Sequence, residues 1–158
     1  MNKPGGIKAL KIVHKVMLMG QIVFAAVSIY LVYAGIINAY LTELDKKLQV
    51  IVLIIAATGI YAGRYYFKKK VFQIQNSLAD AKQKFDAYRA ASLLQWSLIE
   101  IPAIVSIICF FLTANYAFIA LAFFLIAIFA MQAPSKSKIV QQLQIEEAEL
   151  ETLKNLFN

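Results

Sequence analysis

The sequence has a single cysteine and a single histidine, Cys109 and His14, and this scarcity excludes two kinds of chemistry. One cysteine allows no disulfide within the chain. A zinc site needs several His, Cys or carboxylate ligands close together, and neither residue has such neighbours. A glycine-rich phosphate loop and a Ser, His and Asp set at a common depth are also missing. We therefore expect no metal, no cofactor and no enzymatic activity.

Charged residues are scarce as well. They make up 16% of the 158 residues, whereas a soluble domain carries about 25%. Hydrophobic residues make up 61%, and most of them lie in runs that a soluble core of this length could not bury. The composition predicts an integral membrane protein with one membrane domain, residues 1–158, whose main partner is the lipid bilayer.

Four apolar runs have about the 20 residues that a helix needs to cross the hydrocarbon core of a bilayer. They lie at approximately 15–38, 48–67, 93–113 and 116–133. The last two are separated only at residues 113–115, where a break is expected because about 35 residues of unbroken helix would overshoot a bilayer. The predicted fold is all-α, a polytopic membrane protein with four transmembrane helices arranged as two hairpins.

Basic residues are unequally divided between the two sides of these predicted spans. Fourteen lie in the N-terminal segment, between the second and third spans, or in the tail: Lys3, Lys8, Lys11, Lys15, Arg64, Lys68, Lys69, Lys70, Lys82, Lys84, Arg89, Lys136, Lys138 and Lys154. The other side has only Lys46 and Lys47. Because cytoplasmic loops carry the excess of Lys and Arg, both termini are predicted to be cytoplasmic. The net charge of +7 follows from this topology, so we expect no nucleic-acid binding.

Two segments on the predicted cytoplasmic side have apolar residues at helical spacing. The stripe of the first segment contains Val71, Ile74, Leu78, Ala81, Phe85 and Tyr88. The stripe of the second contains Ile139, Leu143, Leu150, Leu153 and Phe157. We expect amphipathic cytoplasmic helices after the second and fourth spans, one in each half of the chain (1–91 and 92–158). They either pack together, against a partner or against copies of themselves, or lie flat on the membrane surface.

Glu100 is the only acid inside a long apolar run. A carboxyl group at membrane depth costs at least about 2.5 kcal/mol, so it usually faces a partner, a water-filled cavity or a proton path. Pro102 lacks an N–H and its ring opposes the carbonyl of Leu98, which predicts either a kink or a freed carbonyl group beside the acid. Arg64 on the second span is the first candidate partner, because its long side chain lies near the same depth, and Gln21 on the first span is another. The remaining candidates are Ser28, Thr58, Gln95 and Ser97.

Two functions are compatible with one intramembrane acid. Glu100 can hold helices together by hydrogen bonding, which fits a non-enzymatic accessory or scaffold subunit of a membrane complex, or a homo-oligomer. Alternatively, it can bind a proton or an ion in a small membrane carrier.

The second span carries two further features. Gly59 and Gly63 are four residues apart, which favours the close approach of another helix. The span then ends against Lys68, Lys69 and Lys70, which predict the cytoplasmic membrane interface.

Three stretches of the C-terminal half carry a resemblance. They are Glu100-Ile101-Pro102-Ala103-Ile104, Leu112-Thr113-Ala114-Asn115 and Pro134-Ser135-Lys136-Ser137-Lys138. Their order and spacing resemble those of a group of small, uncharacterised bacterial inner-membrane proteins with four helices. The resemblance implies the four-helix layout and an inner-membrane location, and it implies no activity. The first stretch is more loosely similar to the membrane carboxyl site of the proteolipid subunits of rotary ATPases.

Overall fold

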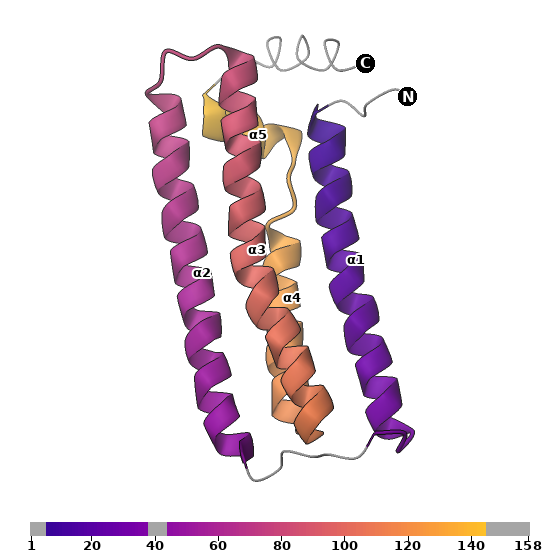
Figure 1. The fold of residues 1–158 in the computed structure, drawn as a ribbon. Coiled ribbons are helices and arrows are strands. Elements are labelled where there is room, and N and C mark those ends of the chain that lie inside the picture. Colours follow the sequence, from indigo (N-terminus) through magenta and orange to yellow (C-terminus); the bar gives the residue numbers. More distant parts are fainter. Residues whose placement is uncertain (1–5, 38–43, 145–158) are drawn as a thin grey trace.

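The structure is a computed structural model that describes residues 6–37 and 44–144. These residues form five helices and no strand: α1 (Gly6–Tyr33), α2 (Asp45–Gln75), α3 (Ala81–Thr113), α4 (Tyr116–Met131) and α5 (Lys136–Leu143). Figure 1 shows α1 to α4 as a bundle of elongated helices, with the short α5 lying across one end. The all-α class predicted from the sequence is confirmed.

Three of the described helices, α1, α2 and α3, are long and apolar enough to cross a membrane. α4 has 16 residues, so it extends for only about 24 Å at 1.5 Å per residue. It counts as a fourth span only together with α5, from which it is bent by 71°. The chain therefore has the helices of an integral membrane protein, three or four in number.

The break between α3 and α4 lies where the sequence predicts it. Ala114 adopts the left-handed conformation with φ 54° and donates its backbone N–H to Phe110 over 2.7 Å, which ends α3. Asn115 then begins α4, because its side-chain oxygen accepts the backbone N–H of Ala117 over 2.9 Å.

A second break, between α4 and α5, follows Met131 and includes Pro134, which has no N–H to donate. Ser135 starts α5 by accepting the backbone N–H of Lys138 over 3.3 Å. The ammonium group of Lys138 reaches back to the carbonyl oxygens of Met131 and Ala133, at 3.3 and 3.4 Å. These contacts fold α5 back across the end of the bundle.

The apolar stripe expected on one amphipathic helix over 71–88 does not form one helix. α2 continues to Gln75 and α3 begins at Ala81, so a turn interrupts the stripe and Leu78 is fully exposed. The turn is stabilised locally, because Ser77 donates its hydroxyl to the Ile74 carbonyl over 2.7 Å and Asp80 caps α3 by accepting the N–H of Gln83. By folding back here, the chain brings the two halves of the stripe face to face.

The two halves of the stripe form a core with α5. The buried residues of this core include Val71, Ile74, Phe85, Tyr88, Ile139 and Leu143. Four of the six residues of the first stripe are therefore buried in a cluster with the chain's own α5, whereas Leu78 is exposed. The rest of the second predicted stripe, Leu150, Leu153 and Phe157, lies outside the described residues.

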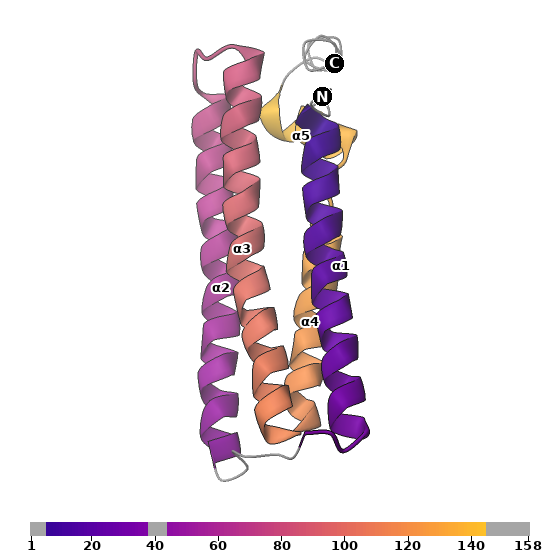
Figure 2. The ribbon, with the colours of Figure 1, turned by 45° about the vertical axis from the view of Figure 1, so that its right-hand side comes forward.

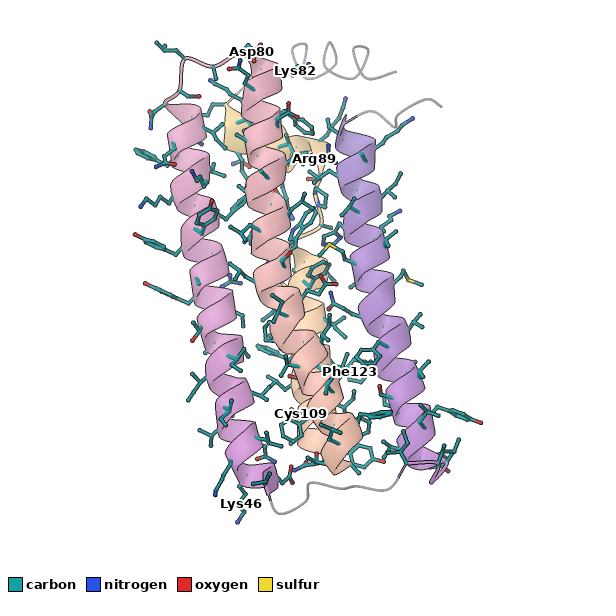
Figure 3. The ribbon with its side chains drawn as sticks, viewed as in Figure 1. Lys46, Asp80, Lys82, Arg89, Cys109 and Phe123 are labelled. Atoms are coloured by element: carbon teal, nitrogen blue, oxygen red, sulfur yellow. The ribbon has the colours of Figure 1, made fainter. Side chains whose placement is uncertain are left out.

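α3 is the central helix and packs against each of the other four. Figure 2 shows α2 beside α3 and α1 beside α4. We call the end that contains the α2–α3 turn and α5 the basic end. Lys82 lies at this end, whereas Lys46 lies at the opposite end, as Figure 3 shows.

Candidate functional site

The two glycines of α2, Gly59 and Gly63, contact α3 and show which face of α3 lies against α2. A Cβ atom added at Gly59 would collide with the carbonyl oxygen of Leu98 and would lie 3.3 Å from Cγ of Pro102. A Cβ atom at Gly63 would lie 3.4 Å from the carbonyl oxygen of Gln95. The predicted glycine pair therefore lies where α2 comes closest to the backbone of α3, and α3 continues as a helix through Pro102.

Glu100 lies on the opposite side of α3 from α2. It is two residues from both Leu98 and Pro102, and successive residues of an α-helix are about 100° apart. Its side chain is therefore turned about 160 to 200° away from the glycines, and no ion pair joins it to Arg64 in the described structure. Arg64 is exposed and lies instead on the wall of a separate cavity, with Gln95. The expected pairing of Arg64 with Glu100 is not formed.

Gln21 of α1 is the polar neighbour of Glu100. Its side chain is close enough to interact with the Glu100 carboxyl group, and it is 98% buried, with 2% of its surface exposed. Neither amide atom of Gln21 makes a hydrogen bond of standard geometry to any described residue. The structure thus brings together two of the predicted site residues, but leaves the pair without a complete set of hydrogen bonds.

His14 of α1 is buried, with 2% of its surface exposed. Its Nε2 lies 3.1 Å from the carbonyl oxygen of Phe129, and because a carbonyl only accepts, Nε2 carries the donated proton. The His14 ring stacks on that of Phe129 with 4.6 Å between centroids, and it meets the edge of Trp96 at 4.8 Å. His14 therefore joins α1 to the end of α4 and to α3.

The sequence did contain a signal for this position. His14, Gln21 and Ser28 recur at intervals of seven residues, or about two helical turns, and all three are buried on the inner face of α1. The hydroxyl oxygen of Ser28 has no hydrogen-bond partner among the described residues. The inner face of α1 thus carries a line of polar groups toward α3 and α4, and Gln21 is its middle member.

One strip of α3 is left uncovered by the neighbouring helices. Leu94, Ile101 and Ile108, again seven residues apart, are 40%, 54% and 43% exposed. We call these three residues the α3 strip. Glu100 precedes Ile101 and is partly buried, so its carboxyl group lies between the α3 strip and Gln21.

The three consecutive lysines of α2 all lie at the basic end and are exposed. They differ in their surroundings. Lys68 lies on the wall of the same cavity as Arg64, whereas the Lys70 ammonium lies 5.9 Å above the ring of Tyr66. Lys69 and Lys70 do not line that cavity.

Within residues 6–37 and 44–144, no three His, Cys, Asp or Glu side chains gather where they could hold a metal ion. Comparisons with protein-family models, curated proteins and solved structures found no match. The arrangement of Glu100, Gln21 and the α3 strip is the feature of the described fold that bears most directly on function.

Proposed function

We propose that this protein is a non-enzymatic accessory or scaffold subunit of a membrane complex, or a homo-oligomer, which associates through the α3 strip. The observation that carries the proposal is the position of Glu100. It lies at the edge of an uncovered apolar strip, beside an amide whose hydrogen bonds are incomplete.

The depth of Glu100 supports this role. Gly59 contacts Leu98 and Pro102, which are two residues before and two residues after Glu100. Gly59 is also fourteen residues after Asp45, the first residue of α2. Glu100 lies at about the level of Gly59. At 1.5 Å per residue, this level is about 21 Å from Asp45, across a hydrocarbon core that is about 30 Å thick. A carboxyl group at this depth is costly unless it is paired or hydrogen-bonded. A polar group on a further transmembrane helix would supply the missing hydrogen bonds.

The apolar surface next to Glu100 fits the same role. Ile101 is more than half exposed, so a helix laid on the α3 strip would contact apolar side chains and reach the carboxyl group together. Four members of the stripe 71–88, by contrast, are already buried within the chain: Val71, Ile74, Phe85 and Tyr88. We therefore place the association surface in the membrane, and the tail beyond residue 144 is a second candidate surface.

Measuring the assembly state in lipid nanodiscs by single-molecule photobleaching tests the proposal. Glu100→Leu should dissociate the assembly, whereas Glu100→Gln should preserve it, because an amide still donates and accepts hydrogen bonds. Ile101→Trp should block the α3 strip. Ile54→Trp is the matched control, because Ile54 is 60% exposed on the outer face of α2. A wild-type protein that is monomeric and copurifies with nothing contradicts the proposal.

The alternative function is that of a small proton-coupled or ion-binding carrier that uses Glu100. The unsatisfied polar atoms of Gln21 and Ser28 favour it, because they leave a polar region inside the bundle near the acid. Liposome flux measurements separate the two functions. Glu100→Gln should abolish pH-dependent flux if Glu100 carries a proton, and should leave assembly intact if Glu100 acts as a hydrogen-bonding group between helices.

The proposed topology has four spans in two hairpins in the inner membrane, with the basic end and both termini in the cytoplasm. It rests on the excess of Lys and Arg at the basic end. Labelling of single cysteines at positions 69 and 46, in a Cys109→Ser background, tests it in spheroplasts. An impermeant maleimide added from outside should label position 46 and spare position 69.

A further inference from the structure

A cavity of about 600 Å³ lies at the basic end, away from Glu100. Its wall is formed by residues of α2 and α3, by α5, and by the segment that connects α4 to α5. None of these residues belongs to the proposed association surface, so the cavity requires a separate explanation.

The charged groups on the wall are all cationic. Arg64 and Lys68 line it from α2, and Lys138 lines it from α5. Among the described residues, no Asp or Glu lies on the wall, and no carboxylate there pairs with these three cations. The cavity therefore attracts an anion, and Arg and Lys are the side chains that commonly bind phosphate.

The polar part of the wall is held in place by hydrogen bonds between helices. Tyr88 donates its hydroxyl to the side-chain oxygen of Gln142 over 2.8 Å, and Gln75 donates its amide to the Gln142 carbonyl over 2.9 Å. Gln132 also lines the cavity, and its amide nitrogen and oxygen are buried without a partner among the described residues. A buried amide without partners is costly, and a ligand oxygen would accept its N–H.

The remaining wall is largely apolar and aromatic, and it includes Phe67, Phe72, Trp96 and Met131.

The depth of the cavity matches the edge of the membrane. Arg64 is nineteen residues from the start of α2 at Asp45, which is about 28 Å at 1.5 Å per residue, close to the thickness of the hydrocarbon core. The cations therefore lie at headgroup level, where a phosphate group and an acyl chain meet.

We propose that this cavity binds an anionic phospholipid of the leaflet at the basic end. Its phosphate group pairs with Arg64 and Lys68 from one side and with Lys138 from the other. The Gln132 amide donates to a headgroup oxygen, and the first part of an acyl chain lies against the exposed side chains of Phe72 and Met131, close to the buried Trp96. This inference does not depend on Glu100, so a failure of the association proposal leaves it unaffected.

Trp96 makes the test direct, because it is the only tryptophan of the chain and lies on the cavity wall. The full-length protein is reconstituted in phosphatidylcholine bilayers that contain a rising fraction of brominated phosphatidylglycerol, and quenching of Trp96 is compared with that by brominated phosphatidylcholine. We expect wild type to prefer the anionic lipid. Arg64→Gln/Lys68→Gln should weaken this preference by about fivefold for each cation removed, which corresponds to about 1 kcal/mol per basic residue.

Lys69→Gln/Lys70→Gln is the matched control, because it removes the same charge from the same helix without touching the wall. Equal loss in both double variants would show diffuse attraction to the membrane surface and overturn the proposal, as would the lack of any preference in wild type. Arg64→Lys/Lys68→Arg keeps both charges and must retain the preference, which separates a binding defect from a folding defect. Relief of the quenching by millimolar glycerol 3-phosphate would identify a soluble phosphate ester and overturn the lipid assignment.

Discussion

Gly59 of α2 packs directly against the backbone carbonyl group of Leu98 of α3. The contact has a cause within α3, because Pro102 has no N–H to donate to the carbonyl four residues before it. The glycine leaves the space in which this free carbonyl group sits, and the ring of Pro102 borders the same space. The proline and the glycine therefore form one packing unit, although they lie on different helices.

Replacing Gly59 by alanine should destabilise the α2–α3 pair. The added Cβ atom meets backbone rather than a flexible side chain, so the helices must move apart. Overpacking of this kind typically costs about 1 to 3 kcal/mol. The measurement is thermal unfolding of the purified protein in detergent, followed by circular dichroism.

Two other glycines are the controls for this substitution. At Gly63 the nearest atom would lie 3.4 Å from the new Cβ, and at Gly20 nothing lies within 4 Å. Gly63→Ala should have a small effect, and Gly20→Ala should be neutral or stabilise α1, by at most about 1 kcal/mol, through helix propensity. Equal Tm values for Gly59→Ala and Gly20→Ala would contradict the packing described here.

The apolar helices could be predicted from the sequence because their physical basis is local, although α4 by itself is shorter than the predicted fourth span. Apolar runs of bilayer length predict membrane helices, and the break at Thr113-Ala114-Asn115 follows from length alone. The fold-back near Leu78 could not be predicted in this way. A stripe at helical spacing is compatible with one amphipathic helix and with two helices facing each other, and the choice depends on α5, which covers both halves of the stripe.

The site was predicted in part. Depth alone placed Arg64 beside Glu100, but the rotational position of each residue around its helix decides which side chains meet. Gly59 of α2 faces Leu98 and Pro102, so Glu100 must face away from α2, toward Gln21 on α1. This step needs only the helical period and one known contact between the two helices. The sequence by itself does not say which face of α3 the glycines touch.

His14 should contribute to the stability of the bundle in two separable ways. His14→Phe keeps an aromatic ring between Phe129 and Trp96 and loses the hydrogen bond to the Phe129 carbonyl, which should cost about 1 kcal/mol. His14→Ala also removes the ring contacts, and should cost about 3 kcal/mol or more. Thermal unfolding gives the stability, and Trp96 emission reports locally. Emission unchanged in His14→Ala would contradict the ring contact.

Asn115 should stabilise the end of the bundle opposite the basic end through two hydrogen bonds. Its side-chain oxygen caps α4 through Ala117, and its amide donates to the carboxylate of Asp45 at the start of α2. Asn115→Ala loses both and should cost about 1 to 2 kcal/mol. Asn115→Asp keeps the cap but sets two carboxylates side by side, so its Tm should rise with salt concentration. Asp45→Asn in that background should remove the salt dependence, and a dependence that persists would contradict the contact.

α5 should be held to the bundle mainly by its apolar side chains, with Tyr88 adding a smaller contribution. Ile139 is fully buried, so Ile139→Ala should cost about 2 to 5 kcal/mol locally. Tyr88→Phe removes only the hydrogen bond to Gln142, worth about 1 kcal/mol.

Hydrogen exchange over residues 136–143, read by mass spectrometry, should therefore rise strongly in Ile139→Ala and modestly in Tyr88→Phe. The exchange at the start of α4 should stay unchanged in both, because Phe118 and Ile119 belong to a different apolar cluster from Ile139. Exchange of residues 136–143 that is as fast in wild type as in Ile139→Ala would mean that α5 is not docked, and it would also remove Lys138 and Gln142 from the cavity wall.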